Sequence, residues 1–356
     1  MKAILTSKRF NPGHISHMEA NCKLLEEQGF DVRYSVNKRF LSFPDCGMQG
    51  KAASFSDWLA LRRGDLFIVW YASVSVVFNL VFVRLFSRAT TVYVYHEPYT
   101  SFSSYRAAGF SRLKTVRVIA ISMVSRIICA LSDKIILPSE RALQAMPAAQ
   151  RQPRRFAKIN LMFADESRLV TQELAREFVS YIGTIAEDHA FDEFVESMQA
   201  CVADQALLPL RFLIATRSTV PDKHRAVIDQ CVSSGRLVLQ VGRPMSNAEI
   251  NHFYASSFVV WNAYRRSMQS GVLPKAYMFG TPVLVSTNNQ SEYFQEGVHG
   301  ALLSVRYTLQ EFQHAITWLQ AEWPGISRNC RTQFLLNFEY HALSSTFMNF
   351  VSDQHE

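Results

Sequence analysis

The chain has 356 residues, 48% of them hydrophobic and 19% charged, with a net charge of +7. This length exceeds what one hydrophobic core usually supports, so we expect two globular domains of ~150–200 residues. No run of ~18 uninterrupted apolar residues occurs, which excludes a membrane-spanning helix. The six cysteines lack CxxC or CxxH spacing, so neither a zinc site nor a disulfide framework is indicated.

Charge is unevenly distributed along the chain. Residues 1–165 carry a net charge of +12 and residues 166–356 a net charge of −5, which favours two domains with different partners. Lys8, Arg9, Asn11 and His14 interrupt the apolar core that a signal peptide would need. With thiols that resemble those of a reducing compartment, these features predict a cytoplasmic protein.

Short apolar runs alternate with helical stretches through the N-terminal half. A helix is predicted over 17–28, and the polar, basic stretch 148–158 is predicted to be a linker. The predicted strands are residues 3–6, 31–35, 66–70, 91–95 and 134–137. Strands separated by helices indicate a parallel, doubly wound sheet.

The C-terminal half repeats this alternation. Helices are predicted over 191–201, from Ser270 to Gly280, and over 330–351. The predicted strands are residues 178–183, 211–215, 237–239, 259–261 and 283–285. We therefore predict an α/β protein with a first domain over 1–165, a second over 166–330, and a C-terminal helix within 331–356.

The stretch 269–286 carries the most information. Pro274 is tolerated only in a first helical turn, and Gly280 suits a left-handed C-terminal cap. A helix that starts beside Gln269, Ser270 and Gly271 leaves backbone N–H groups free and suits a phosphate. The same pattern also fits an ordinary helix-to-strand unit of any α/β protein.

Its residues resemble the donor-sugar loop and helix of retaining, two-domain (GT-B) glycosyltransferases of the group 1, family 4-like type. The closest resemblance is to a bacterial surface-polysaccharide branch with the Q-S-G…F-G-x-P-V motif. The matching residues are Ser267, Gln269, Ser270, Gly271, Val272, Phe279, Gly280, Pro282 and Val283. Residues 11–14, 96–98 and 131–140 are similar to other segments of the same family. The resemblance implies two Rossmann-like domains facing a cleft, with the C-terminal helix packing back across it.

Two loops of the N-terminal half gain roles from this resemblance. It implies that Gly13 and His14, after the first strand, lie against donor and acceptor groups. It also implies that His96, as the catalytic residue, contacts the transferred sugar or its acceptor. Glu97 follows in the same loop. Two alternatives stay open: an ordinary Asn-Pro-Gly turn at 11–13 and a structurally satisfied histidine at 96.

The expected donor site departs from the family pattern. Family members usually carry a glutamate for the nucleotide ribose at the position of Lys275. Basic residues also usually follow the strand that ends at Gly183 and Thr184, where this chain has none except His189. Arg217, Arg265, Arg266 and Lys275 are the cations expected to bind the donor phosphates instead. A solvated basic face is the alternative for Arg265 and Arg266.

The resemblance also implies the chemistry. The sequence has no D-x-D pair of the kind that carries a metal in other glycosyltransferases, and the implied mechanism is metal-independent with retention of configuration. The nucleotide-sugar is then a co-substrate, and no cofactor is expected. No nucleophilic carboxylate is evident, so no catalytic base is named.

Residues 98–132 contain five cations and no acidic residue, interleaved with apolar positions. Such a segment suits an anionic membrane surface, which predicts a peripheral protein on the inner face of the cell membrane. Its apolar residues surround more than one helix face, so much of it is also expected to be ordinary core. No nucleic-acid partner is predicted, because no binding module is recognisable.

The leading hypothesis is a hexosyltransferase-like enzyme that moves sugar from a nucleotide-sugar to a saccharide acceptor, lipid-linked or part of a surface polysaccharide. The alternative is a non-catalytic or partner-dependent relative in a polysaccharide assembly complex, motivated by Lys275, Thr184 and His189. A nicotinamide-dependent oxidoreductase is disfavoured because no G-x-G-x-x-G follows the first strand. If Lys275 reaches the donor, Lys275→Glu is expected to weaken donor affinity and not stability.

Overall fold

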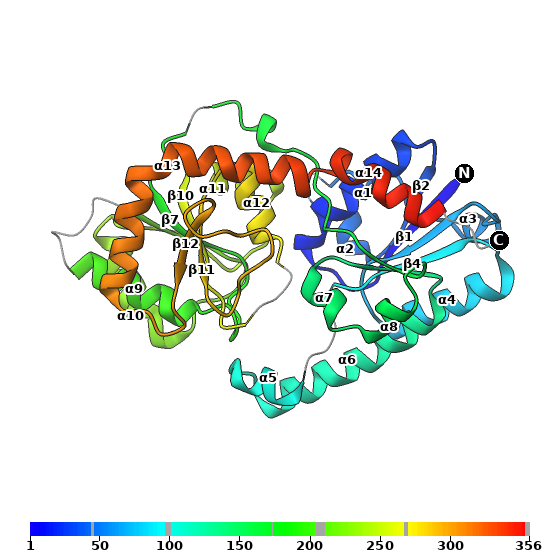
Figure 1. Ribbon diagram of the computed structural model, residues 1–356, viewed down its shortest axis with the longest axis horizontal. Coiled ribbons are helices and arrows are strands. Elements are labelled where there is room, and N and C mark those ends of the chain that lie inside the picture. The colour runs from blue at the N-terminus through cyan, green and yellow to red at the C-terminus, as the bar shows by residue number, and fades with distance from the viewer. Residues whose placement is uncertain (44–45, 97–100, 173, 204–210, 267–269, 353–356) are drawn as a thin grey trace. The chain divides into compact units, whose positions relative to one another are not determined.

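A computed structural model describes residues 1–43, 46–96, 101–172, 174–203, 211–266 and 270–352 (Figure 1). The chain forms two compact units. Unit 1 comprises Met1–Ala164 with Asn337–Glu356, and unit 2 comprises Asp165–Leu336. Each unit contains a six-stranded parallel sheet with flanking helices, so the predicted pair of doubly wound α/β domains is confirmed.

The sheet of unit 1 has the strand order β2-β1-β3-β4-β5-β6. Its strands are β1 (Lys2–Ser7), β2 (Asp31–Val36), β3 (Leu66–Val69), β4 (Thr90–Val94), β5 (Lys134–Leu137) and β6 (Phe156–Lys158). The chain moves from β1 to one edge, then returns to β3 and moves to the other. The carboxyl ends of β1 and β3 therefore form the topological switch point, where open α/β sheets bind ligands.

Helices of unit 1 cover both faces of this sheet. They are α1 (Ile15–Glu27), α2 (Lys38–Leu41), α3 (Phe55–Leu59), α4 (Val74–Phe86), α5 (Phe102–Ala107), α6 (Arg112–Leu131), α7 (Glu140–Gln144), α8 (Pro147–Arg151) and α14 (Tyr340–Ser352), with a 3₁₀ turn at Pro12–His14. Right-handed crossovers place α4 and α6 on one face, because both connections advance in the same direction across the sheet, and α1 on the other. Helix α14 packs against α1.

The sheet of unit 2 has the strand order β12-β11-β10-β7-β8-β9. Its strands are β7 (Phe178–Ile182), β8 (Arg211–Ala215), β9 (Leu237–Gln240), β10 (Ser257–Asn262), β11 (Val283–Ser286) and β12 (Gly300–Leu303). Every residue of β7, β10 and β11 is buried, as expected for central parallel strands covered on both faces. The switch point of unit 2 lies between β7 and β10.

Unit 2 has fewer, longer helices. They are α9 (Phe191–Ala203), α10 (Arg225–Ser233), α11 (Asn247–Ser256), α12 (Val272–Met278) and α13 (Leu309–Asn337, whose last residue belongs to unit 1), with 3₁₀ turns at Ser167–Leu169 and Asp222–His224. Helix α12 contains Pro274 in its first turn and ends before Gly280, which has φ +63°. The predicted start and stop signals of this helix are both confirmed.

The predicted linker at 148–158 was wrong. This stretch contains the end of α8 and the edge strand β6, which pairs with β5. Strand β12 was missed because it begins at Gly300, where a Cβ would lie 1.9 Å from the carbonyl oxygen of Val283. The strand begins where the backbone of Gly300 lies close to the backbone of Val283 in β11, and a pattern of apolar side chains does not reveal such a contact.

The predicted helix over 330–351 is two helices. The backbone of Phe163 accepts a hydrogen bond from Tyr340 N (3.0 Å) and donates one to Phe338 O (2.9 Å). This short β-bridge to Glu339 separates α13 from α14. Pairing with Phe163, which lies 176 residues before Glu339 (339 − 163), interrupts an otherwise continuous helical pattern.

Candidate functional site

The loop after β7 meets the start of α12 at the switch point of unit 2. Gly183 ends β7 with φ +139°, a conformation that strongly favours glycine. A Cβ at Gly183 would lie 3.9 Å from Cγ2 of Val272, so the two segments are in contact distance. The structure thus places Gly183 beside Val272, and each of these residues has one further predicted donor-site residue, Thr184 and Gly271, next to it in the chain.

Hydrogen bonds hold this loop in place. The carbonyl of Thr184 accepts from Tyr181 Oη (3.0 Å) and from His189 Nδ1 (2.6 Å). The amide of Ile185 donates to Ser218 Oγ (3.1 Å), and the His189 ring stacks on Tyr264 with centroids 4.5 Å apart. The ends of three neighbouring strands therefore fix the loop that a ligand at the switch point would contact.

The two arginines after β10 are ion-paired within unit 2. Arg265 makes a bidentate pair with Glu193, with N–O distances of 2.7 and 2.8 Å, and hydrogen bonding to Glu193 raises the pKa of Arg265. Arg266 Nε lies 2.9 Å from Oδ2 of Asp188, which is 3% exposed. The predicted phosphate-binding cations are present, but carboxylates already accept hydrogen bonds from both.

Lys275 does not face solvent, contrary to what a phosphate-binding role requires. It is 5% exposed, and its Nζ lies 2.8 Å from Glu166 Oε2. Asn251 Nδ2 donates to the same carboxylate oxygen at 2.9 Å. The expectation that Lys275 adds a cation to the donor site is therefore corrected: its charge is used in a buried ion pair.

The remaining predicted donor residues differ in their surroundings. Ser270 Oγ accepts a hydrogen bond from Val272 N at 3.1 Å. This N–H group at the start of α12 is therefore already used and is not available to a ligand. Arg217 is exposed after β8. Gln269 lies outside the described residues, as does Ser267.

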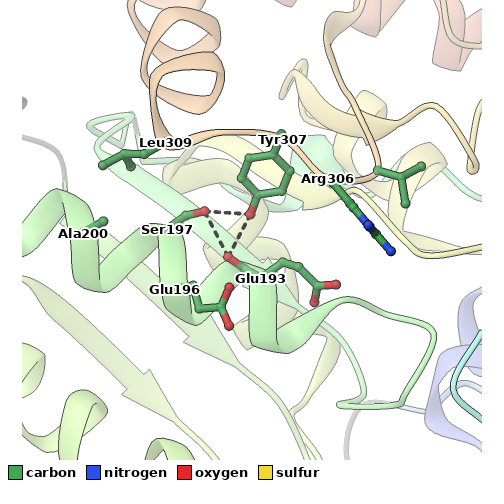
Figure 2. Close-up of a pocket in the computed structure, with 8 residues that line it drawn as sticks. Glu193, Glu196, Ser197, Ala200, Arg306, Tyr307 and Leu309 are labelled. Atoms are coloured by element: carbon green, nitrogen blue, oxygen red, sulfur yellow. Dashed lines mark hydrogen bonds between the residues drawn. The ribbon is translucent and has the colours of Figure 1, made fainter.

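A separate cavity of about 360 Å³ opens between α9 and the segment before α13 (Figure 2). Figure 2 shows Tyr307 and Ser197 pointing toward one another. Ser197 Oγ lies 2.7 Å from Tyr307 Oη, and both hydroxyls donate to the carbonyl of Glu193. Glu193, Glu196 and Arg306 add charge to the lining. Two carboxylates against one arginine make this cavity a poor site for a diphosphate.

Unit 1 gathers aromatic and imidazole rings at its own switch point. His14 and His96 stack in parallel, with centroids 5.3 Å apart and an interplanar angle of 3°. The ring centroid of Trp70 lies 5.3 Å from that of His96, and the ring centroid of Tyr71 lies 5.7 Å from that of His14. Segments after β1, β3 and β4 supply these rings, so the predicted residues His14 and His96 do come together.

Burial sets the protonation of His96. It lowers the pKa of His96 to about 4, against a smaller opposing effect of a hydrogen bond with the Trp70 backbone. The His96 Nε2 atom is buried and makes no hydrogen bond within the described residues. A pKa of about 4 makes His96 neutral at pH 7. Glu97 lies outside the described part of the chain.

Side-chain hydrogen bonds of Asn11 hold the loop that carries Gly13 and His14. Asn11 Oδ1 accepts from Gly13 N at 3.2 Å, and Asn11 Nδ2 lies 3.1 Å from His14 Nε2. Gly13 is exposed, as expected for backbone that a ligand approaches. The predicted turn is therefore present as a 3₁₀ turn over Pro12–His14 that is capped by Asn11.

Sequence reasoning missed four residues of these two clusters: Trp70, Tyr71, Asp188 and Tyr264. Trp70 and Tyr71 directly follow β3, and Tyr264 follows β10. Their position after switch-point strands is the signal that would have found them. Asp188 had no local signal, since its partner Arg266 lies 78 residues away.

Comparison with known proteins gives a family match and a fold match. Residues 176–322 match the family model "Glycosyl transferases group 1". A search of curated protein sequences found no match. Among solved structures, Anabaena HepE in complex with UDP-glucose has a TM-score of 0.67 at 12% identity, covering 99% of this chain and 100% of HepE.

Two further structures extend the fold match. Sucrose-phosphate synthase from Thermosynechococcus elongatus has a TM-score of 0.64 at 15% identity, covering 99% of this chain and 98% of that chain. A glycosyltransferase from Rickettsia africae has a TM-score of 0.65 at 8% identity, covering 99% of each. The fold is that of the GT-B glycosyltransferases. The family match lies within unit 2 and includes β7, β10 and α12, the elements that form its switch point.

Proposed function

We propose that the protein is a glycosyltransferase that binds a nucleotide-sugar at the switch point of unit 2. The family match over residues 176–322 carries this proposal, because it spans both segments that meet there. Gly183, Thr184, Gly271 and Val272 would contact the donor through their backbone, together with Ser270 and Gln269. The structural neighbour HepE was solved with UDP-glucose, which makes UDP-glucose the first donor to test.

In this proposal His96 is the catalytic residue of unit 1. Because its imidazole is neutral at pH 7, it would act as a hydrogen-bond partner of the transferred sugar and not as a cation. Gly13, His14 and Glu97 would border the acceptor. A hydrogen bond that strengthens as charge develops is worth roughly 10²–10³ in rate.

The leaving diphosphate needs charge stabilisation. Arg265 and Arg266 would supply it by exchanging part of their contact with Glu193 and Asp188 for phosphate oxygens. Arg217 would add a third cation. We further propose that transfer retains anomeric configuration and needs no metal, and that the acceptor is a saccharide, lipid-linked or part of a surface polysaccharide.

Nucleotide release from UDP-, GDP- and ADP-sugars, measured with saccharide and lipid-linked acceptors, tests the proposal. We expect turnover with one donor, unchanged by EDTA, a product with the anomeric configuration of the donor by NMR, and a loss of about 100-fold in kcat/KM for His96→Ala. Absence of turnover with every donor and acceptor would count against catalysis.

The ion pairs of Arg265 and Arg266 favour a second candidate, a non-catalytic protein that binds saccharide or nucleotide within an assembly complex. With both cations neutralised by carboxylates, donor binding without efficient bond cleavage is chemically reasonable. Thermal shift with each nucleotide separates the two functions. Stabilisation without turnover supports the second, and turnover by the purified chain excludes it.

A further inference from the structure

Helix α6 in unit 1 packs Ile128 and Cys129 into the core, but it also buries small polar residues and exposes several large apolar ones. Its inward residues include Thr115, Ser122 and Ser125, each less than 9% exposed. The hydroxyls of Thr115 and Ser125 donate to carbonyls one turn earlier, at 2.9 and 3.1 Å. These two buried hydroxyls therefore need no partner outside the helix, whereas several large apolar side chains lie on its outward side.

The outward residues of α6 form a stripe at helical spacing. Leu113 is 75% exposed, Val116 56%, Met123 61% and Ile127 49%. The intervals of three, seven and four residues keep these side chains on one side of the helix. An amphipathic helix of an ordinary soluble domain keeps its outward side polar, whereas α6 carries this apolar stripe outward in addition to the apolar residues that it packs inward.

Helix α4 continues the same surface. It packs against α6 on the same face of the sheet (Figure 1). Its exposed side chains Val74, Phe78, Val81 and Leu85 are also spaced by helical turns, and Phe78 is 70% exposed. We call these eight residues of α4 and α6 the apolar stripes. Large exposed apolar surface of this kind marks an interaction site.

The charged residues around the apolar stripes are mostly basic, which favours a partner with negative charge. Residues 66–132 contain seven cations and a single acidic residue, Glu97. Arg88, Arg112, Arg117 and Arg126 are exposed, and no carboxylate of the described residues pairs with them. Two copies of this chain meeting through this face would bring the cations of both together, which disfavours self-association.

We propose that the α4–α6 face is a docking surface for an anionic lipid bilayer. The apolar stripes would enter the boundary between headgroups and acyl chains, and the four arginines would contact lipid phosphates. A helix that could cross a bilayer is not found among the described residues. The proposal does not depend on the proposed sugar transfer, and its test has no activity readout.

Sedimentation of the full chain with vesicles tests it. Vesicles of phosphatidylcholine with phosphatidylglycerol are expected to bind the protein, and vesicles of phosphatidylcholine alone to bind it much less. Because one cation contributes about fivefold to such binding, Arg117→Gln with Arg126→Gln should weaken it about 25-fold. Phe78→Ser with Leu113→Ser should abolish it. All four side chains are exposed, so circular dichroism should show an unchanged fold.

Matched variants elsewhere control for general changes of charge and polarity. Lys23→Gln with Arg39→Gln removes two exposed cations outside α4 and α6, and Leu336→Ser removes an apolar side chain that is 65% exposed on α13. Neither control should change vesicle binding. Equal binding by all variants, or no binding to either vesicle, overturns the proposal. So does a concentration-dependent dimer in sedimentation velocity that Leu113→Ser dissociates, because a second copy would then cover the face.

Discussion

At the scale of single residues, the site of unit 2 is governed by which charges are already paired. Lys275, Arg265 and Arg266 each lie within 3 Å of a carboxylate oxygen. For the two partly accessible arginines a ligand can compete for hydrogen bonds. For Lys275, which is buried, separation of the pair would leave an unpaired carboxylate inside unit 2.

Reversing the charge of Lys275 should therefore destabilise the protein. Lys275→Glu places two carboxylates together in a buried position, and we expect a loss of about 3–5 kcal/mol in the free energy of unfolding. Urea denaturation measures it. The sequence predicted an effect on donor affinity and not on stability, and the ion pair with Glu166 reverses that expectation. The double variant Lys275→Glu with Glu166→Lys should recover part of the loss; an unchanged midpoint for the single variant would contradict this account.

His96 should make stability pH-dependent. Its pKa is about 4 in the folded chain and about 6.5 when unfolded, so between these values the unfolded chain binds the extra proton. Stability contributed by neutral His96 is complete above pH 6.5 and is lost as the pH falls toward 4, by up to about 3 kcal/mol. Urea midpoints at pH 7 and pH 4.5 should differ more for the wild type than for His96→Asn. Equal differences would show that His96 is not the group responsible.

At the scale of elements, helix α12 begins and ends where residue chemistry requires. Pro274 occupies its first turn, and Gly280 takes a positive φ directly after its C-cap. For helix α6 the residues alone are not sufficient, because the periodicity of its apolar residues does not show which side of the helix is buried. The expectation that much of 98–132 is ordinary core holds for residues such as Tyr105 and Ile128, whereas the outward residues of α6 are exposed.

Gly280→Ala tests the helix end. A Cβ there would lie 2.8 Å from Ser327 Oγ and 3.1 Å from the Ser327 carbonyl oxygen, in a backbone conformation that alanine disfavours. We expect a loss of about 1–3 kcal/mol in stability, seen as a lower Tm. Gly325→Ala in α13 is the matched control, because no atom lies within 4 Å of the added Cβ. It should be neutral or slightly stabilising, and a similar loss in both variants would remove the steric explanation.

At the scale of the whole molecule, the last described helix belongs to the first unit. Phe347 and Val351 of α14 are buried in unit 1, and Tyr340 Oη donates to Glu27 of α1 at 2.6 Å. Folding of unit 1 therefore requires segments separated by all of unit 2. Phe347→Ala should destabilise unit 1 by about 3–5 kcal/mol, because it leaves a cavity in a packed interface.

Equilibrium unfolding checks this expectation, with Thr346→Ala as an exposed control on the same helix. Proteolysis should release unit 1 fragments earlier in Phe347→Ala than in the control. If both variants unfold alike, α14 does not contribute to the stability of unit 1.

The sequence by itself determined the alternation of strands and helices, the two-domain α/β fold, and the loops in which His14, His96, Gly183 and Gly271 lie. These features depend on local chemistry: apolar runs, proline and glycine positions, and the rule that ligands collect after parallel strands. Only the tertiary structure decided that Lys275 pairs with Glu166, that Arg266 pairs with Asp188, that α14 belongs to unit 1, and that Leu113 of α6 is exposed. Each of these depends on residues brought together across many positions of the chain, and no local pattern encodes which distant partner a charge or an apolar face will meet.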